Sequence, residues 1–211
     1  LEVQQEIVDE LEGYQKIIDG CKQVVENYKP TIDIDPSWEM VELGEITNIS
    51  TGKLNANAAI ENGEHPFFTC SKEISKINEY AYDQECILLS GNNAVGNFDV
   101  KYYKGKFNAY QRVYIISLNE ESNDKVDYQI LYYAINQSLN ILKGLSVGSM
   151  TRYLTLPVVE SIQIPMPSMD IQKEIVQKIE EERKVIEGNK KLIEIYTQKI
   201  QNRISKVWGE E

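Results

Sequence analysis

The chain opens and closes on two versions of one amphipathic helix. Residues 3–20 read VQQEIVDELEGYQKIIDG, and residues 171–188 read IQKEIVQKIEEERKVIEG. A shift of 168 positions aligns nine identical residues over 25 positions. Heptad spacing accounts for shared apolar residues, but it does not account for two further pairs. These pairs are Gln4/Gln172 and Gly20/Gly188. We interpret the two segments as a duplicated helix.

Apolar residues recur along both copies at the three- and four-residue steps of a coiled-coil seam. The predicted seam residues are Ile7, Leu11, Tyr14, Ile18, Val25, Ile175, Ile179, Ile186, Ile193 and Ile200. Pro30 ends the first helix, because proline cannot continue the helical hydrogen bonding. The sequence therefore predicts a helix over residues 1–29, a linker over 30–37 and a second helix over 168–208.

The middle of the chain, residues 38–167, has a different sequence pattern from the two helices. Short runs rich in β-branched and aromatic residues, such as CILLSGNNAVGNF and RVYIISL, alternate with glycine, asparagine and serine. The stretch DYQILYYAINQSLNILKGL at 127–145 predicts one helix, and VVESIQIPMP predicts a last strand. The order of strands, helix and strand predicts an α+β fold, with one mixed domain flanked by two long helices.

The net charge of −11 argues against nucleic acid as a partner, because phosphate binding requires lysine and arginine. The charge is unevenly distributed, however. Residues 1–37 carry nine acids against three bases, whereas residues 100–118 hold Lys101, Lys104 and Lys106 together with Arg112 and no acid. A local basic face on an acidic protein is therefore compatible with the sequence.

Neither a metal site nor a catalytic site is expected. Cys21, Cys70 and Cys86 form no CxxC pair, the single histidine is His65, and unpaired thiols favour the reduced cytoplasm. The stretch DPSW at 35–38 approximates the [DNS]-P-P-[FYW] motif of amino-group methyltransferases. It lacks the second proline and any preceding GxGxxG element, so a linker turn is the better interpretation. No apolar run reaches the length of a membrane span, and no cofactor is predicted.

Polar side chains in the glycine- and asparagine-rich loops are the candidate DNA contacts. Asparagine and glutamine suit adenine, arginine and lysine suit guanine, and serine suits phosphates or base edges. The candidates are Lys53, Asn55, Ser71, Lys72, Asn92, Asn93, Gln111, Arg112, Ser149 and Arg152. The same residue types also form turns, so the loops alone leave both interpretations open.

The combined motifs resemble the specificity (S) subunits of type I restriction–modification systems, over essentially the whole chain. SVGSMTRYLTLPVVESIQIPMPSMDIQKEIVQKIEE is similar to the end of a target recognition domain and the helix that follows it. VELGEITNISTGK is similar to the start of such a domain, and ILLSGNNAVGNF to its central strand and turn. The opening segment resembles the helix that joins two recognition domains.

The resemblance implies a non-catalytic DNA-binding subunit whose partners are double-stranded DNA, a methyltransferase subunit and, indirectly, a restriction subunit. It also implies that residues 38–167 are a target recognition domain reading half of a bipartite target, and that the helices pack as an antiparallel coiled coil. Helices of ~40 Å match about one turn of B-DNA, ~34 Å, as a spacer between half-sites.

S subunits carry two recognition domains, whereas this chain holds one. We therefore expect the C-terminal half of a longer S subunit, or a half-subunit that forms a homodimer through its helices. The alternatives are the specificity domain of a fused adenine methyltransferase or restriction enzyme, and a coiled-coil scaffold that binds protein.

Overall fold

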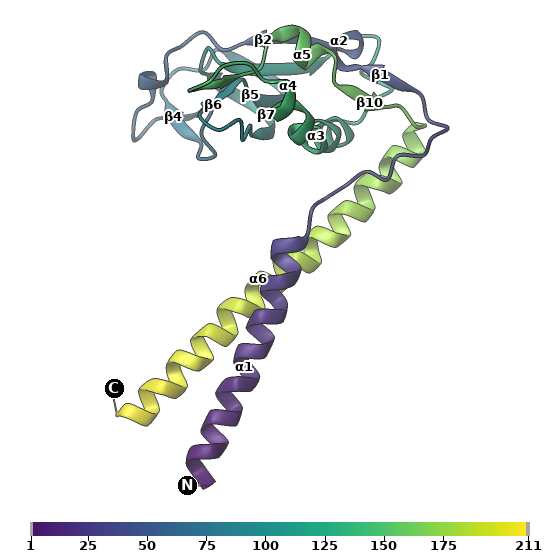
Figure 1. Cartoon of the computed structure of the whole chain (residues 1–211). Helices are drawn as coiled ribbons and strands as arrows, with labels where there is room; N and C mark the ends of the chain where they lie inside the picture. The colour runs from purple at the N-terminus through teal and green to yellow at the C-terminus, as the bar shows by residue number, and fades with distance from the viewer. Residues whose placement is uncertain (1, 210–211) are drawn as a thin grey trace. The chain divides into compact units, whose positions relative to one another are not determined.

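Two long helices lie at the ends of the chain. In the computed structural model, which describes residues 2–209, α1 spans Glu2–Asn27 and α6 spans Met169–Trp208 (Figure 1). Leu1–Pro30 and Gln177–Glu211 form one structural unit, and Thr31–Val176 forms another. No helix within residues 2–209 is both long and apolar enough to cross a membrane.

The helices of the first unit run antiparallel. The rings of Tyr14 and Tyr196 lie 5.4 Å apart, and one turn earlier on α1 the Glu10 carboxylate is 3.0 Å from Arg203, farther along α6. Lys199 lies over both rings, with its Nζ 4.6 Å from the Tyr196 ring centre. These polar and aromatic contacts fix the register of the pair, because a shift by one turn would separate every partner.

The predicted seam residues are all at least partly shielded from solvent. Ile18, Ile179 and Ile186 are buried, and the other seven are half-buried. Cys21, one heptad step beyond Tyr14, is buried as well. The interface is therefore apolar along its length and interrupted by the tyrosine layer.

The second unit is built on a six-stranded mixed sheet in the order β2-β8-β5-β7-β3-β4. All neighbouring strands are antiparallel except β3 and β7. The strands are β2 Thr47–Thr51, β3 His65–Phe68, β4 Ser75–Ile77, β5 Tyr82–Ser90, β7 Val100–Ala109 and β8 Val113–Leu118. The predicted α+β class is confirmed.

Smaller elements complete the domain. Two short ribbons pair β1 (Met40–Glu42) with β10 (Gln163–Pro165), and β6 (Asn92–Asn93) with β9 (Arg152–Tyr153). The helical segments are α2 Leu43–Ile46, η1 Ala56–Ala58, α3 Tyr128–Gln137, α4 Leu139–Leu145 and α5 Leu156–Glu160. The β6–β9 ribbon lies next to the β5 end of the main sheet, because Gly91 directly follows β5 and precedes β6.

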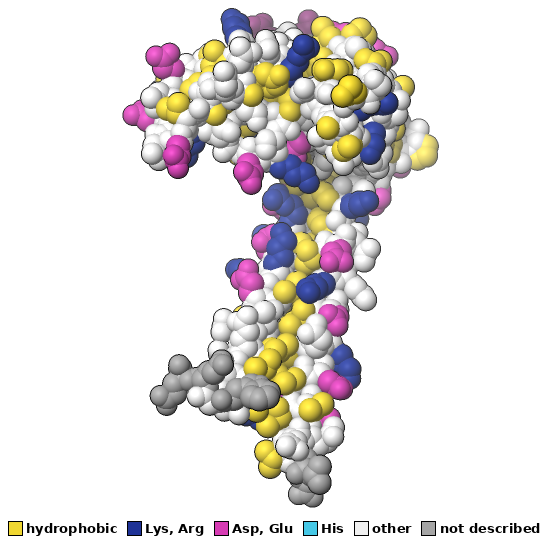
Figure 2. Space-filling view, turned by 60° about the vertical axis from the view of Figure 1, so that its left-hand side comes forward, with side chains coloured by type: hydrophobic (Ala, Val, Ile, Leu, Met, Phe, Trp, Pro, Cys, Tyr) yellow, Lys and Arg dark blue, Asp and Glu magenta, His cyan; other side chains and the backbone are white. Residues whose placement is uncertain are grey.

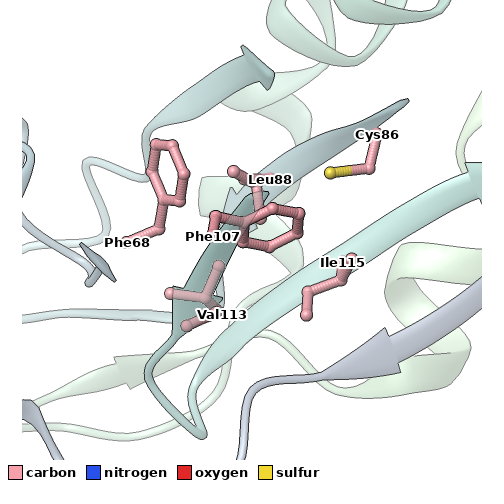
Figure 3. Packing of buried hydrophobic residues seen from close by; sticks show 7 residues of the cluster. Phe68, Cys86, Leu88, Phe107, Val113 and Ile115 are labelled. Carbon is pink, nitrogen blue, oxygen red and sulfur yellow. The ribbon is translucent and has the colours of Figure 1, made fainter. Parts of the chain in front are cut away.

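The sheet curls around an apolar cluster. β7 ends beside the start of β5, where Phe107 pairs with Tyr82, whereas β8 begins beside the end of β5, where Val113 pairs with Ser90. The nine residues of β5 extend over about 27 Å, yet only three residues connect Ala109 to Val113, a span of at most roughly 14 Å. The strand ends must therefore approach each other across one face. That face holds the cluster drawn in Figure 3: Phe68, Cys86, Leu88, Phe107, Ala109, Val113 and Ile115.

The alternate residues of the same strands point to the opposite face. Ile87, Leu89 and Ile116 are fully buried there, as the two-residue period of a strand requires. Helix α3 contacts β5 and β7. Burial in this domain is therefore two-sided, which explains the almost continuous apolar run in β5.

The helix predicted over 127–145 is divided in two at Ser138. The Ser138 hydroxyl donates to the Ala134 carbonyl at 3.0 Å, and α4 begins at the next residue. A serine that bonds back to the preceding turn bends or interrupts a helix. At the other end, the Asp127 side chain caps α3 by accepting from the Gln129 backbone N–H at 2.7 Å.

Gln172 ties the first turn of α6 to the domain. Its side chain is completely buried, and its Nε2 donates to the carbonyls of Lys125 at 2.8 Å and Pro167 at 2.9 Å. Its Oε1 accepts from the backbone N–H of Asp127 at 2.8 Å. Three backbone groups therefore depend on one amide. Gln4, its equivalent in the first copy of the repeat, is exposed.

Glu85 gives the domain a pH-dependent cross-strand contact. Partial burial raises the pKa of Glu85, but the hydrogen bonds from Tyr102 at 2.6 Å and Lys104 at 2.9 Å outweigh it, so the pKa is lowered overall. Burial and the Glu85 contact raise the pKa of Tyr102 to about 12. The ionised carboxylate therefore stabilises the fold above its unfolded pKa of about 4.3, and this contribution is lost as the pH falls through the lower folded pKa.

We expect Glu85→Gln to lower the free energy of unfolding by about 1 kcal/mol at pH 7, because a charge-assisted pair is replaced by a neutral one at a partly exposed site. The difference between variant and parent should shrink below pH 4. Urea unfolding at pH 7, 5 and 3.5 measures it. A difference that stays constant across this range would contradict the proposed ionisation.

Candidate nucleic-acid interface

A polar hollow of about 220 Å³ opens on the surface of the second unit, between the β7–β8 connection and the start of the β6–β9 ribbon. Its lining residues are Thr51, Gly91, Gln111, Arg112, Tyr114, Tyr153 and Leu154. Gln111 and Arg112 were predicted as candidate contacts. The other five were not, because their side chains or backbone reach the hollow only through the fold.

Gln111 and Arg112 occupy the centre of a tight turn. The Val113 backbone N–H donates to the Tyr110 carbonyl at 2.9 Å, which closes a four-residue β-turn from Tyr110 to Val113. Both central side chains are exposed. The turn therefore presents an amide and a guanidinium group side by side.

Backbone contacts hold this turn from several directions. Tyr110 N–H donates to the Phe68 carbonyl at 2.9 Å, Gln111 N–H donates to the Leu54 carbonyl at 2.9 Å, and Gly91 N–H donates to the Arg112 carbonyl at 2.7 Å. These partners come from separate segments of the chain. The turn is consequently rigid at its backbone, while its side chains remain accessible.

Two glycines are needed for this close packing. A Cβ at Gly52 would lie 2.2 Å from the Ala109 carbonyl oxygen, and one at Gly91 would lie 2.6 Å from the Arg112 carbonyl oxygen. Both values are below any real Cβ contact with backbone. The glycines of STGK and LSGNN therefore allow the backbone to pack closely behind the turn.

Other predicted residues surround the turn. Asn55 Oδ1 accepts from Gln111 Nε2 at 2.9 Å, and Asn92 pairs with Tyr153 in the β6–β9 ribbon. The Oδ1 of Asn92 is buried and accepts no hydrogen bond from the described residues. Tyr153 lies under Arg112, with the guanidinium carbon 5.8 Å from the ring centre. This stacking partner was missed by sequence reasoning.

Arg152 is engaged within the protein. Its guanidinium donates to the Ser146 hydroxyl at 2.9 Å and to the carbonyls of Ser146 at 2.8 Å, Lys143 at 3.3 Å and Gly148 at 3.3 Å. These bonds close the loop after α4, where Gly148 has a φ of +103°. Arg152 therefore acts here as a support for the loop that carries the exposed Ser149.

Asn93 likewise shapes its own loop. Its Oδ1 accepts from the backbone N–H groups of Val95 at 2.9 Å and Asn97 at 3.0 Å. Such side-chain-to-backbone bonds are typical of asparagine in turns. The Asn93 side-chain oxygen is therefore satisfied within its own loop.

The remaining candidates are exposed loop residues: Lys53 after β2, and Ser71 and Lys72 between β3 and β4. The Ser71 carbonyl accepts from Lys101 Nζ at 2.9 Å. The neighbouring Cys70 Sγ contacts the Arg112 carbonyl at 3.5 Å, which places the β3–β4 loop beside the turn. Ser71 and Lys72 therefore border the same surface.

Most of the acid-free stretch 100–118 does not contribute cations to the hollow. Lys101 pairs with Asp99, Lys104 pairs with Glu85 at 2.9 Å, and Lys106 lies over the Tyr80 ring. Arg112 forms no ion pair with the described residues. The basic face expected from the sequence is thus reduced at the hollow to Arg112.

The thiols near the site are not set up as nucleophiles. Burial raises the pKa of Cys70, and it raises the pKa of Cys86 to about 12. Within the described residues, no group of three His, Cys, Asp or Glu side chains is arranged to hold a metal ion. The chemistry that this surface offers is hydrogen bonding, stacking and one accessible guanidinium charge.

The second unit is thus an α+β domain that presents a rigid polar turn and no metal-binding group within the described residues. Residues 36–196 match the type I restriction modification DNA specificity domain. The chain is 38% identical over 157 residues to the specificity subunit of the type I restriction enzyme EcoDI from Escherichia coli, which covers 74% of this chain and 34% of that protein. The chain therefore belongs to the family of type I restriction–modification DNA specificity domains.

Solved structures share the fold. The type I S subunit from M. genitalium matches with a TM-score of 0.58 and 16% identity, over 72% of this chain and 40% of that one. The HsdS subunit from Thermoanaerobacter tengcongensis matches with a TM-score of 0.57 and 15% identity, over 97% of this chain and 53% of that one. The chain thus spans between a third and about half of these relatives.

Proposed function

We propose that this chain is a non-catalytic, DNA-reading part of a type I restriction–modification enzyme and that it works in the cytoplasm on double-stranded DNA. Its recognition domain reads one half of a bipartite target. The observation that carries this proposal is the Gln111–Arg112 turn, whose backbone is fixed and whose polar side chains are exposed to solvent. No observation favours the fused enzyme or the protein-binding scaffold.

The acidic composition is compatible with this role because much of the negative charge lies in the first 37 residues of the sequence, outside the stretch that carries the turn. Residues 1–37 hold six of the eleven excess negative charges, nine acids less three bases. Arg112, Lys53 and Lys72 are exposed on the recognition domain. Partner subunits would supply further phosphate contacts.

The test is DNA binding by the complex assembled with its methyltransferase subunit. We expect Arg112→Ala to weaken binding to DNA that contains the sequence methylated by the complex. The expected loss is about 5- to 150-fold, the range for one lost arginine contact of ~1–3 kcal/mol. Lys104→Ala is the matched control, because Lys104 is paired with Glu85. Fluorescence anisotropy at 50 and 200 mM salt measures both. Equal effects of the two changes, or binding that does not depend on salt, would exclude this interface.

We further propose that the helices dock helices of methyltransferase subunits, and through them the restriction subunit. Each copy of the repeat carries a second apolar stripe outside the seam. Ile17 and Val24 are 38% and 45% exposed, and their equivalents Val185 and Leu192 are 60% and 40% exposed. Figure 2 shows apolar side chains following the helices between charged ones.

Glycine stands at the centre of both stripes. Gly20 lies three residues after Ile17, and Gly188 lies three residues after Val185. A Cβ at either glycine would meet nothing within 4 Å, so neither is required by packing within the chain. Because a mid-helix glycine is unfavourable, both are best explained by close approach of another helix. The duplication then favours two copies of the same docking element.

A homodimer through these helices is the competing occupant of the stripes. Light scattering of the chain alone and with the methyltransferase subunit distinguishes the two. A monomer that binds two methyltransferase subunits supports the docking proposal. A stable dimer that leaves the stripes inaccessible to that subunit contradicts it.

A further inference from the structure

We propose that the turn Tyr110–Val113 reads two adjacent base pairs in the major groove, with Gln111 on an adenine and Arg112 on a guanine. This inference rests on the proposed DNA-reading function and assigns the bases to named side chains. It predicts that the half-site contains an A·T pair next to a G·C pair.

The spacing of the turn fits a base step. Gln111 and Arg112 are consecutive, so their Cα atoms are about 3.8 Å apart, and stacked base pairs are about 3.4 Å apart. Both side chains leave the same exposed turn, whose backbone donates to the Leu54 carbonyl and accepts from the Gly91 N–H. Two neighbouring side chains can therefore meet two neighbouring base edges without rearrangement of the backbone.

Gln111 is oriented for adenine by Asn55. The Gln111 amide has two N–H donors and one carbonyl oxygen, and one N–H is engaged by Asn55 Oδ1 at 2.9 Å. The remaining N–H donor and Oε1 acceptor complement N7 and the N6 amino group of adenine. Asn55 is thus a positioning residue, and Gln111 makes the contact.

Arg112 is oriented for guanine by stacking. Its guanidinium carbon lies 5.8 Å from the Tyr153 ring centre, and its carbonyl is fixed by Gly91 N–H at 2.7 Å. Arginine offers only donors, and guanine presents two acceptors, N7 and O6, on its major-groove edge. Arg152 has the same side chain, but its guanidinium donates hydrogen bonds to Ser146, Lys143 and Gly148 within the protein. It is therefore not assigned a base.

The experiment maps methylated adenines in cells that carry the complex of this chain with its methyltransferase subunit. We compare the parent with Gln111→Ala, Arg112→Ala and Arg112→Lys. Each good bidentate contact discriminates about 5- to 150-fold against a wrong base. Gln111→Ala should relax one A·T position, and both arginine changes should relax the neighbouring G·C position. Lys104→Ala should leave the recognised sequence unchanged.

Arg112→Lys separates base reading from phosphate binding, because lysine keeps the charge but loses the planar fork. A phosphate contact would survive in Arg112→Lys, and its loss in Arg112→Ala would weaken all sequences alike. Normal binding by Arg112→Lys together with uniformly weakened binding by Arg112→Ala would overturn the base assignment. Relaxation at two positions that are not adjacent would overturn it as well. Both results leave DNA reading by this domain intact. Unchanged target sequence and affinity in all three variants would exclude this turn as a DNA-contacting surface. Circular dichroism checks that the variants remain folded.

Discussion

Replacement of Gln172 by alanine will lower the free energy of unfolding by about 3–5 kcal/mol, whereas the same change at Gln4 will have almost no effect. The completely buried Gln172 amide satisfies the carbonyls of Lys125 and Pro167 and the N–H of Asp127. A buried backbone group left without a partner costs about 1–3 kcal/mol, and the Pro167 carbonyl is buried while the Lys125 and Asp127 groups are part-buried. Urea unfolding followed by circular dichroism measures the loss.

Gln4 is a matched control because it occupies the equivalent position of the repeat and is exposed. Its alanine variant changes helix propensity by only a few tenths of a kcal/mol. Gln172→Leu tests whether volume or hydrogen bonding matters, since leucine fills similar space without polar atoms. If Gln172→Leu is as stable as the parent, the hydrogen bonds do not carry the stabilisation.

The second large effect is expected for the double variant Gly20→Gln/Gly188→Gln. The isolated chain should become more stable by about 0.5–1 kcal/mol per site, because glycine is unfavourable within a helix and no neighbour obstructs a side chain. Binding of the methyltransferase subunit should weaken roughly 30-fold or more, because overpacking costs about 1–3 kcal/mol at each of two sites. Isothermal titration calorimetry measures the affinity.

Gly144→Gln is the control, because Gly144 lies in α4 with no atom near its missing side chain. It should leave assembly unchanged. A double variant that is more stable and still assembles with the parent's affinity would show that close approach at the glycines is not required. The opposite signs of the two effects make a general folding defect distinguishable from a docking defect.

The fold class was predictable because its signals are local. Heptad spacing, Pro30 and the alternation of apolar runs with turn residues depend only on neighbouring residues. The single helix predicted over 127–145 was wrong, since the Ser138 hydroxyl bonds to the Ala134 carbonyl and interrupts it. Side-chain competition for a backbone carbonyl is not visible in an apolar pattern.

The candidate site was predictable in its residue types only. Gln111 and Arg112 were chosen for their chemistry, but their partners Asn55 and Tyr153 lie far away in the chain. The curled sheet brings these segments together. Sequence reasoning could not separate Arg112 from Arg152, because the bonds that occupy Arg152 come from a loop conformation.

The duplicated helix also shows the difference between what a sequence pattern predicts and what depends on the fold. The repeat in the sequence shows that Gln4 and Gln172, and Gly20 and Gly188, are equivalent positions on two amphipathic helices. In the folded protein, however, Gln172 is completely buried and Gln4 is exposed, a difference that the repeat does not predict. The physical reason is that an amide is held only where unpaired backbone groups surround it, and those groups belong to the folded domain.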